Sequence, residues 1–592
     1  RGLRGINPFN LQMQINGQTV NGDNISGWEQ CIDMKEATHN THFICDGKAD
    51  VSYSICALRN LPYAGLVRVE VTALGDMYLT VSNPIEVPDE YKNIGSKLVN
   101  VNVNGNDIKI VRTWALSKHR EQKVSASSAF IYDKNSNVQQ QYNGNGQISI
   151  PLKKGEKFFF TLLGAVCTGR DFIDPYNEAD REVIYGAKEG LARLMDGHQK
   201  LWDEMWKGDI VIEGDDEAQR AVRFALYNLY SNARKGSRLS IPPFGLSSQG
   251  YNGHIFWDTE FWMYPPMLFM NQGIARTMMD YRTDRLEAAC QKALSYGYDG
   301  AMFPWEDDAV EEACPTWALT GPFEHHITAD IAIAAWNYYC MSGDQRWLRE
   351  EGFPLMEKVA EFWVSRVEKN DDGSYSIRNV VCADEYAEGD DNAFTNGTVI
   401  RALQDATKAA FICGVKAPVI WKEIAAKLRI PKFENGVTME YDGYSGQVIK
   451  QADANLLVYP LNLITRPEEI RKDLEYYEGK IDKGGPAMSF SVLALQYARL
   501  GEGDKAYELF VQSFRHNQLP PFGVLSEGAG GTNPYFSTGA GGLLQTVING
   551  FCGLEITDNG IKQLPSKLPE HWRRLVVKGV GPDGKTYVRL QK

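Results

Sequence analysis

The chain has 592 residues, of which 43% are hydrophobic, with a formal net charge of −13 and a pI near 5.4. A chain of this length can bury a large core, so we expect a globular protein of two to four domains. The excess of acidic residues excludes a typical nucleic-acid-binding protein, because such proteins concentrate Lys and Arg.

The first part of the chain alternates apolar and polar residues in the manner of β-strands, with Asn-Gly turns at Asn16-Gly17 and Asn104-Gly105. The strand signals are clearest at residues 67–71, 99–103 and 157–162. This pattern predicts an N-terminal antiparallel β-sandwich over residues 1–175, followed by a helical linker over 176–212.

Helical patterns then recur over residues 213–550. They are expected at about 216–234, 257–270, 273–295, 328–342, 347–369, 396–413, 418–428, 466–478, 487–500, 503–516 and 540–551. The helices share no repeated motif, which disfavours a solenoid. Helical hairpins in this number can close into an (α/α)6 barrel, and residues 551–592 return to short strands such as 574–578, indicating a small C-terminal β-sheet domain.

Ten cysteines are scattered without a Cys-x-x-Cys pair, so we expect neither a zinc cluster nor a disulfide framework. No run of about 18 apolar residues is present, so we expect no membrane span. The chain starts at Arg1 without Met or a signal peptide, as a mature or trimmed chain would. This start and the Gly- and Asn-rich composition favour a periplasmic or secreted protein over a cytoplasmic one.

Two distant loop segments each offer a carboxylate: Asp384-Glu385-Tyr386, and Glu527 in a glycine-rich stretch that also contains Ser537–Gly542. Cleavage of a glycosidic bond needs an acid that protonates the departing oxygen and a second carboxylate on the opposite face of the sugar. The pair therefore suggests sugar chemistry. Taken singly, each Glu is better explained as a structural loop residue than as a catalytic one.

Further loop residues would suit a sugar site. Trp257-Asp258 and Trp305-Glu306 each place an indole beside a carboxylate, and Lys450-Gln451 supplies donors for neighbouring hydroxyls. The alternatives are that Asp258 caps a helix, that Glu306 is a solvated surface acid, and that Lys450-Gln451 is ordinary surface polarity. The adjacent pair His325-His326 has no metal-binding spacing, so no metal and no cofactor are predicted.

The chain resembles glycoside hydrolase family 65, and its characteristic segments occur in the family's order. They are Phe256–Glu260, Tyr281-Arg282, Gly297–Glu306, His326–Ala332, Asp384–Tyr386, Asp391–Asn396 and Lys450–Asp453. The resemblance covers essentially the whole chain and implies an N-terminal β-sandwich, a helical linker, an (α/α)6 catalytic barrel and a C-terminal sheet domain. Relative to the family's sandwich, the resemblance implies a start that lacks the first strands.

The family contains inverting hydrolases and inverting phosphorylases that act on α-glucosides. The resemblance implies that Glu385 is the general acid, that Trp257, Asp258, Lys450 and Gln451 hold the nonreducing glucose, and that Trp305 and Glu306 shape the neighbouring subsite. Phosphorylases of the family bind phosphate through a stretch resembling Thr-Thr-x-Glu-Gly-Ile-His-x-Gly. This chain instead reads Asn533–Gln545 without that His, and Glu527 precedes the loop as in the family's hydrolases.

We therefore expect an inverting, exo-acting α-glucosidase in which Glu527 activates water, with kojibiose (α-1,2) as the first substrate expected. Nigerose, trehalose or a glucosyl-galactose unit are alternatives, since linkage preference depends on the loop around Trp305, Glu306 and residues 315–323. A phosphate-dependent disaccharide phosphorylase and a noncatalytic sugar-binding protein remain as other functions. The expected partner is the α-glucoside itself, with a homodimer as an option.

Overall fold

The computed structural model describes residues 4–103, 105–247, 250–308 and 311–591. These residues form two compact units, one that ends at Trp206 and one that starts at Lys207. The unit boundary therefore follows the second helix of the expected linker. Asn104, in the second expected Asn-Gly turn, lies outside the described residues.

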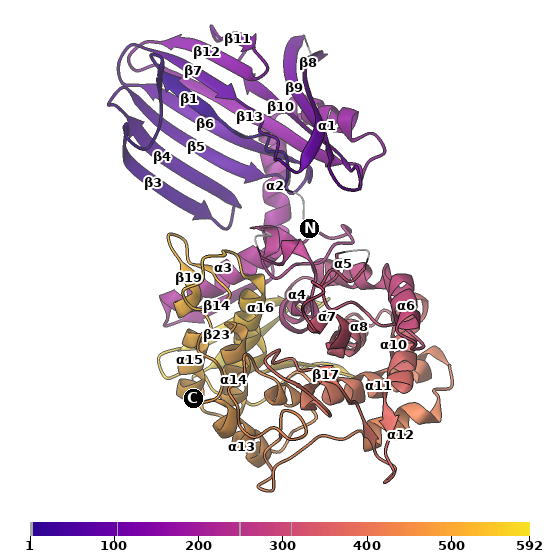
Figure 1. Ribbon diagram of the computed structural model, residues 1–592. Helices are drawn as coiled ribbons and strands as arrows, with labels where there is room; N and C mark the ends of the chain where they lie inside the picture. Colours follow the sequence, from indigo (N-terminus) through magenta and orange to yellow (C-terminus); the bar gives the residue numbers. More distant parts are fainter. Residues whose placement is uncertain (1–3, 104, 248–249, 309–310, 592) are drawn as a thin grey trace. The chain divides into compact units, whose positions relative to one another are not determined.

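The N-terminal unit contains two antiparallel sheets (Figure 1). The five-stranded sheet has the order β11-β12-β7-β1-β2 and the eight-stranded sheet the order β3-β4-β5-β6-β13-β10-β9-β8. The strands are β1 (Gln12–Ile15), β2 (Gln18–Thr19), β3 (Ile25–Asp33), β4 (Thr38–Cys45), β5 (Ala49–Ala57), β6 (Ala64–Ala73), β7 (Met77–Asn83), β8 (Tyr91–Val103), β9 (Asn106–Ser117), β10 (Lys123–Tyr132), β11 (Gln139–Tyr142), β12 (Gly146–Leu152) and β13 (Lys157–Thr168).

The two sheets share one hydrophobic core, as the alternation of their sequences predicts. Leu79 and Ile150 from the five-stranded sheet pack in the same cluster as Val51, Val69 and Phe160 from the eight-stranded sheet. Residues at every second position of a strand point to the same face, so these side chains bury one face of each sheet. The expected N-terminal sheet domain is present.

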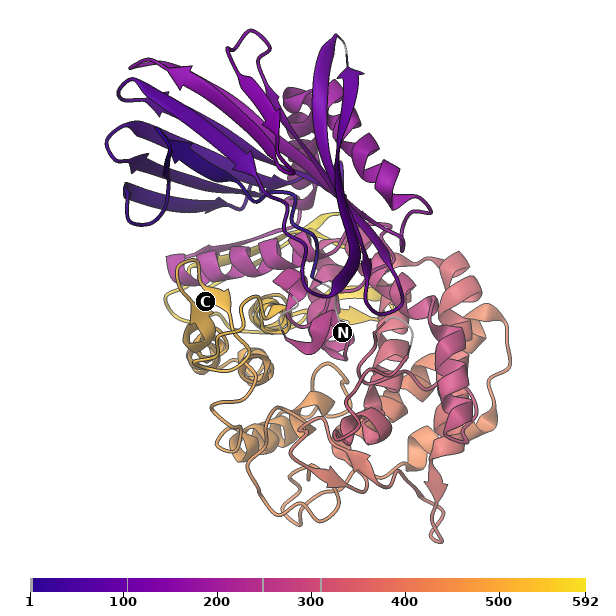
Figure 2. The ribbon, with the colours of Figure 1, turned by 45° about the horizontal axis from the view of Figure 1, so that its top comes forward.

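The first expected Asn-Gly turn is confirmed. Asn16 and Gly17 have φ angles of 52° and 81° and join β1 to β2, a two-residue connection in which both central residues need positive φ. Two helices, α1 (Pro175–Glu189) and α2 (Leu191–Met205), follow the last strand, and α1 packs against β9, β10 and β13 (Figure 2).

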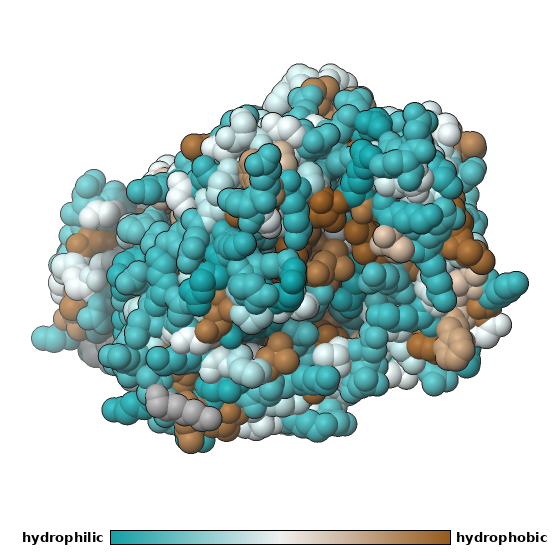
Figure 3. All heavy atoms as spheres, turned by 90° about the horizontal axis from the view of Figure 1, so that it is seen from below, coloured by the Kyte–Doolittle hydropathy of each residue, from teal (hydrophilic) through white to brown (hydrophobic). Residues whose placement is uncertain are grey.

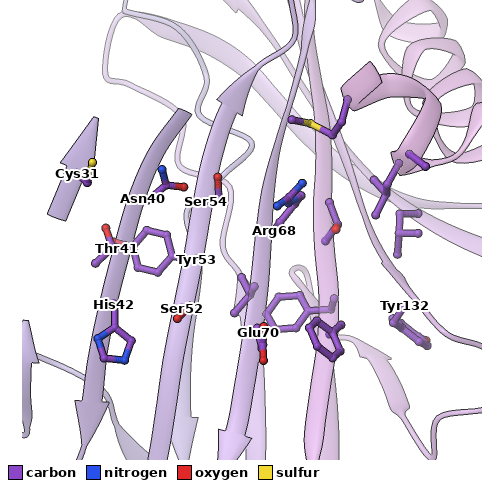
Figure 4. Close-up of a pocket in the computed structure, with 18 of the residues that line it drawn as sticks. Cys31, Asn40, Thr41, His42, Ser52, Tyr53, Ser54, Arg68, Glu70 and Tyr132 are labelled. Carbon is purple, nitrogen blue, oxygen red and sulfur yellow. The ribbon is translucent and has the colours of Figure 1, made fainter. Parts of the chain in front are cut away.

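A hollow of about 830 Å³ lies on the eight-stranded sheet beside the start of α2. Figure 4 shows His42, Ser54, Arg68 and Glu70 on neighbouring strands of this hollow. The Glu70 carboxylate is paired at 2.6 Å with the exposed ammonium of Lys157. None of the expected site residues lies there.

The C-terminal unit is mainly helical. Its helices are α3 (Asp216–Asn232), α4 (Tyr264–Met270), α5 (Gln272–Thr283), α6 (Leu286–Ser295), α7 (Thr320–Phe323), α8 (His326–Ser342), α9 (Gln345–Trp347), α10 (Phe353–Arg366), α11 (Ala393–Cys413), α12 (Val419–Lys427), α13 (Pro467–Tyr477), α14 (Met488–Arg499), α15 (Gly503–Gln512) and α16 (Ser537–Gln545). Three π-helical segments, η3 (Thr259–Met263), η4 (Leu348–Gly352) and η7 (Thr546–Phe551), adjoin α4, α10 and α16.

Helices far apart in the sequence pack against one another in this unit: α8 on α11, and α16 on both α3 and α14 (Figure 1). Several helix ends are capped by side chains or by glycine. The Asp215 carboxylate accepts from Ala218 N at 3.0 Å at the start of α3, and Asn392 accepts from Thr395 N at 2.8 Å at the start of α11. Gly414, with φ 75°, ends α11 in the left-handed conformation that favours glycine.

Two expectations for individual elements were wrong. The single helix expected over 273–295 is two helices, α5 and α6, that break at Asp284-Arg285. The strand-like run 377–381 forms only the short strand β17 (Val380–Val381), which pairs with β18 (Glu388–Gly389) around the Asp-Glu-Tyr motif.

Short strands complete the unit. They are β14 (Asp209–Glu213), β15 (Glu368–Lys369), β16 (Tyr375–Ser376), β19 (Gln518–Leu519), β20 (Val524–Leu525), β21 (Leu554–Thr557), β22 (Gly560–Gln563), β23 (Arg574–Val580) and β24 (Lys585–Leu590). The C-terminal strands β23 and β24 form a sheet with β14, which precedes all the helices of this unit. This sheet therefore joins the segment before the helical region to the segment after it.

Figure 3 shows a mostly hydrophilic face with apolar residues gathered in a recessed area. Within the described ranges, no helix combines the length and the apolar character that crossing a bilayer requires.

Candidate active site

All eight expected site residues line one cavity of about 670 Å³ in the C-terminal unit. They are Trp257, Asp258, Trp305, Glu306, Glu385, Lys450, Gln451 and Glu527. They come from five separate stretches of chain, so the fold brings together residues up to 270 positions apart in sequence. The cavity contains the two carboxylates that a glycosidic cleavage needs.

Glu385 sits in the hairpin between β17 and β18 with a positive φ of 56°. A left-handed backbone is uncommon for a residue with a side chain, and it concentrates at functional sites. Here it is held by a hydrogen bond from Glu385 N to Cys382 O at 2.8 Å. The carboxylate lies 3.0 Å from Lys450 Nζ, and its side chain is 25% exposed.

Glu527 follows β20 and accepts a hydrogen bond from the Tyr251 hydroxyl at 2.8 Å. Burial raises the pKa of Glu527 above its usual value, and the nearby charge of Glu385 raises it further. The Tyr251 hydrogen bond and the Lys450 charge oppose this shift. Glu385 and Glu527 therefore interact electrostatically across the same cavity.

Two buried indoles, Trp257 and Trp305, lie in the cavity wall with 2% and 4% exposure. Their rings are stacked with centroids 6.5 Å apart, and the His326 ring packs edge-on against both, at 5.0 and 5.4 Å. His326 Nδ1 lies 2.8 Å from Asp330 and Nε2 lies 3.1 Å from Glu324. Burial lowers the pKa of His326 to about 3, so a neutral imidazole supports the two indoles.

The Asp258 carboxylate faces the cavity and accepts a hydrogen bond from the Thr538 hydroxyl at 2.5 Å. It makes no capping hydrogen bond to the helix that follows, so the capping alternative was wrong. Burial raises the pKa of Asp258 to about 7, although the Thr538 hydrogen bond opposes the rise. Asp258 is thus a buried carboxyl group in the wall of the cavity.

Glu306 is 7% exposed, so it is no solvated surface acid. Its carboxylate lies 2.7 Å from His254 Nδ1. Beside it, Asp307 and Glu260 flank the fully buried guanidinium of Arg282, at 3.1 and 2.8 Å. Because Glu260 and Asp307 are close neighbours of Asp258 and Glu306 in the sequence, this triad holds both segments of chain in place.

Lys450 and Gln451 are tied to the motif that carries Glu385. The Lys450 N–H donates to Asp384, and the Gln451 amide donates to Ala383 O and lies 3.5 Å from Glu385. Burial alone would lower the pKa of Lys450, but the charge and hydrogen bond of Glu385 raise it. Neither residue is ordinary surface polarity.

Behind this loop lies a cluster of three buried carboxyls, Asp384, Glu440 and Asp453. Glu440 receives no hydrogen bond from any N–H or O–H of the described residues, and it lies within hydrogen-bonding range of Asp384. Two carboxyls can bond to each other only if one holds a proton. Burial and the charges of Asp453 and Asp384 raise the pKa of Glu440, so we assign the proton to it.

The glycines near Glu527 have a packing role. A Cβ on Gly528 would lie 2.7 Å from Gly484 O, and one on Gly541 would lie 2.4 Å from Trp262 O. These glycines allow backbones of the protein to approach each other.

The sequence did not point to several residues of the site. Tyr251 and His254 precede the first quoted segment, which starts at Phe256, and Thr538 lies in the quoted glycine-rich stretch. Glu440 carried no signal, because only the fold places it against Asp384. Among the described residues, no group of three or more His, Cys, Asp or Glu is arranged to hold a metal ion.

Comparison with known proteins gives matches over nearly the whole chain. The profile of the glycosyl hydrolase family 65 N-terminal domain matches residues 4–205, and that of the central catalytic domain of the same family matches residues 223–447. A solved structure assigned as a kojibiose phosphorylase from the human microbiome has a TM-score of 0.82 at 16% identity, covering 99% of this chain and 84% of that chain. This likeness supports the fold.

Curated relatives are also similar in sequence. A kojibiose hydrolase of Flavobacterium johnsoniae is 46% identical, covering 99% of this chain and 88% of its own length. A kojibiose hydrolase of Mucilaginibacter mallensis is 42% identical with the same coverage. A protein-glucosylgalactosylhydroxylysine glucosidase of Dictyostelium discoideum is 37% identical, covering 74% of this chain and 63% of its own length.

Proposed function

Because this chain belongs to glycoside hydrolase family 65, we propose that it is an inverting α-glucosidase that hydrolyses kojibiose and releases β-glucose. Two relatives more than 40% identical over nearly the full chain are kojibiose hydrolases. The observation that carries the mechanism is the placement of Glu385 and Glu527, from distant segments, in one cavity where the charge of Glu385 raises the pKa of Glu527.

The reaction is a single displacement. Glu385 gives its proton to the glycosidic oxygen as the bond from that oxygen to the glucose C1 breaks. Glu527 takes a proton from a water whose oxygen forms the new bond to C1 from the opposite face. The raised pKa of Glu527 makes it a stronger base than an ordinary carboxylate.

The nonreducing glucose is held by Trp257, Asp258, Lys450 and Gln451, and the leaving glucose by Trp305 and Glu306. A sugar ring offers an apolar face to an indole and hydroxyls to the carboxylate and amide groups. The ammonium of Lys450 pairs with Glu385 in the cavity. On binding it exchanges this partner for sugar hydroxyls, which lets Glu385 hold the proton it must donate.

The helical region fits an (α/α)6 barrel over residues 213–550, between the N-terminal sandwich (1–175) with its helical linker (176–212) and a C-terminal sheet domain (551–592). Recurrent helical hairpins and a cavity lined by their connecting loops support this architecture.

Water is favoured over phosphate as the nucleophile. Phosphate in the position of that water would meet the carboxylate of Glu527 at close range, which is repulsive in a buried site. A phosphorylase is the second candidate, since kojibiose phosphorylases also occur among the relatives, at 31% identity. It would release glucose 1-phosphate only when phosphate is supplied.

The test is an assay of the purified chain on α-linked glucose disaccharides in buffer free of phosphate. We expect free glucose from kojibiose at a rate that added phosphate does not raise. Strict dependence on phosphate would instead establish the phosphorylase, and binding of kojibiose without its consumption would establish a sugar-binding protein.

A second substrate, α-glucosyl fluoride, distinguishes the roles of the two carboxylates, because its fluoride leaves without needing a proton. Glu385→Gln should lose most activity on kojibiose, by about 100- to 10,000-fold, and keep much more of it on the fluoride. Glu527→Gln should lose activity on both substrates. Equal losses on both substrates in Glu385→Gln would remove the acid role from that residue.

A further inference from the structure

The outer part of the cavity is lined by large apolar side chains that are exposed to solvent. Trp317 is 83% exposed, Tyr386 60% and Leu319 46%, and all three line the same cavity as the two carboxylates. An indole that is this exposed contributes little to the stability of the fold, because it removes little apolar surface from water. Its position needs another reason.

Exposure changes steeply across this one cavity. Trp257 and Trp305 are 2% and 4% exposed and Asp258 is 8%, whereas Trp317 is nearly fully exposed. The cavity therefore runs from a dry inner end to an open rim. An exo-acting hydrolase places the terminal glucose at the inner end, so the rest of a longer substrate has to pass the rim.

The rim also offers polar groups beside its aromatic rings. Trp317 precedes α7, which packs against β17, and the partner strand β18 brings Glu388 into the wall of the same cavity. Tyr386 stands between these strands, and its hydroxyl donates to Asp482 at 3.0 Å, which ties the rim to the loop before α14.

We propose that Trp317 and Glu388 form an outer sugar subsite that binds the unit attached to the reducing side of the leaving glucose. This inference rests on the proposed function. The indole face would stack on the apolar C–H face of the sugar ring, and the Glu388 carboxylate would accept hydrogen bonds from its hydroxyls. The ligand class is thus an α-glucoside of three or more units rather than a free disaccharide alone.

The experiment compares kcat/KM for kojibiose with that for the trisaccharide of α-1,2-linked glucose, in the full chain and in Trp317→Ala. An aromatic contact at such a site is worth about 3- to 10-fold in affinity. We expect the ratio of trisaccharide to disaccharide efficiency to fall by this factor, through KM. Trp317→Phe should restore most of the ratio, because a ring still stacks. Glu388→Gln should lower it less.

Phe411→Ala is the matched control, because Phe411 is 85% exposed on α11 and does not line the cavity. It should leave the ratio unchanged. A ratio that Trp317→Ala leaves within twofold of the wild type overturns the subsite while the proposed function stands. If the wild-type chain cleaves neither sugar, the proposed function fails and the subsite with it.

A second copy of the chain is the other occupant that an exposed indole could have. Sedimentation of the wild type and of Trp317→Ala distinguishes it. We expect the same oligomeric state for both. A dimer that Trp317→Ala dissociates would assign Trp317 to an interface and contradict the subsite.

Discussion

The ammonium nitrogen of Lys450 lies 3.0 Å from the carboxylate of Glu385 inside the cavity. In the proposed mechanism Glu385 is the general acid, so this ion pair must separate before Glu385 can donate a proton. Sugar binding supplies the means, since hydroxyls can take over the donors of Lys450. Binding and activation of the acid are coupled in this account.

Lys450→Gln removes both the ion pair and the charged donor to the sugar. We expect kcat/KM for kojibiose to fall about 10- to 100-fold, as for the loss of a hydrogen bond to a charged group. Steady-state kinetics measure this loss. Lys483→Gln, at an exposed position that does not line the cavity, should behave as the wild type. Full activity in Lys450→Gln would contradict the coupling.

Tyr251→Phe removes the hydrogen bond that lowers the pKa of Glu527. Glu527 must be ionised to accept a proton, so activity rises as pH increases through its pKa. That pKa is already above the ordinary value of Glu, and the variant should move the acidic limb of the kcat/KM profile to still higher pH. The profile measured from pH 4 to 8 checks this shift.

The control for this shift is Tyr535→Phe, which removes an exposed phenol outside the cavity and should leave the limb in place. An acidic limb that Tyr251→Phe leaves unmoved would show that Glu527 does not control it.

Glu440→Gln tests the buried carboxyl cluster. An amide N–H can replace the proton that joins Glu440 to Asp384, so this variant should keep near-normal activity. Glu440→Ala removes the partner of Asp384, which accepts from the backbone of Lys450. A displaced Lys450 should lower kcat/KM about 10- to 100-fold. Equal activity of the alanine and glutamine variants would contradict a positioning role.

The buried proton on Glu440 should also make the thermal stability of the wild type depend on pH. The folded chain keeps a proton on Glu440 that the unfolded chain releases above the ordinary pKa of 4.5. The unfolded state is therefore favoured progressively as pH rises above that value. Glu440→Gln lacks this dependence, so its Tm relative to the wild type should increase between pH 6 and 9. Thermal unfolding at several pH values measures the difference.

Arg282 is the buried centre of a charged triad with Glu260 and Asp307. Arg282→Met leaves two buried carboxylates without their cation, and we expect a loss of about 3–5 kcal/mol in stability. The Tm from thermal unfolding should fall accordingly. Arg285→Met, at the partly exposed neighbour 3.8 Å from Asp307, should cost much less. A Tm close to that of the wild type in Arg282→Met would contradict the structural role of the triad.

The sequence predicted elements with strong local signals. The turn at Asn16-Gly17 and the alternation in the long strands both depend on nearest neighbours along the chain. The break between α5 and α6 was missed because no Gly or Pro marks Asp284-Arg285. It falls next to Arg282, whose side chain enters a triad that only the tertiary structure assembles.

The site residues also divide into those that a local motif reveals and those that only the tertiary structure reveals. Residues in recognisable motifs, such as Trp257-Asp258 and Asp384–Tyr386, were found because family resemblance orders them along the chain. Tyr251, Thr538 and Glu440 were not predicted individually, since each matters through one contact to a residue at least 56 positions away. Such contacts leave no periodicity and no motif in a single sequence.

The most direct measurement is the anomeric form of the first glucose released from the nonreducing end of kojibiose, followed by proton NMR in buffer without phosphate. Water activated by Glu527 on the face opposite the leaving group gives β-glucose, with α-glucose appearing only as the product mutarotates. Initial release of α-glucose would contradict the single displacement by Glu385 and Glu527.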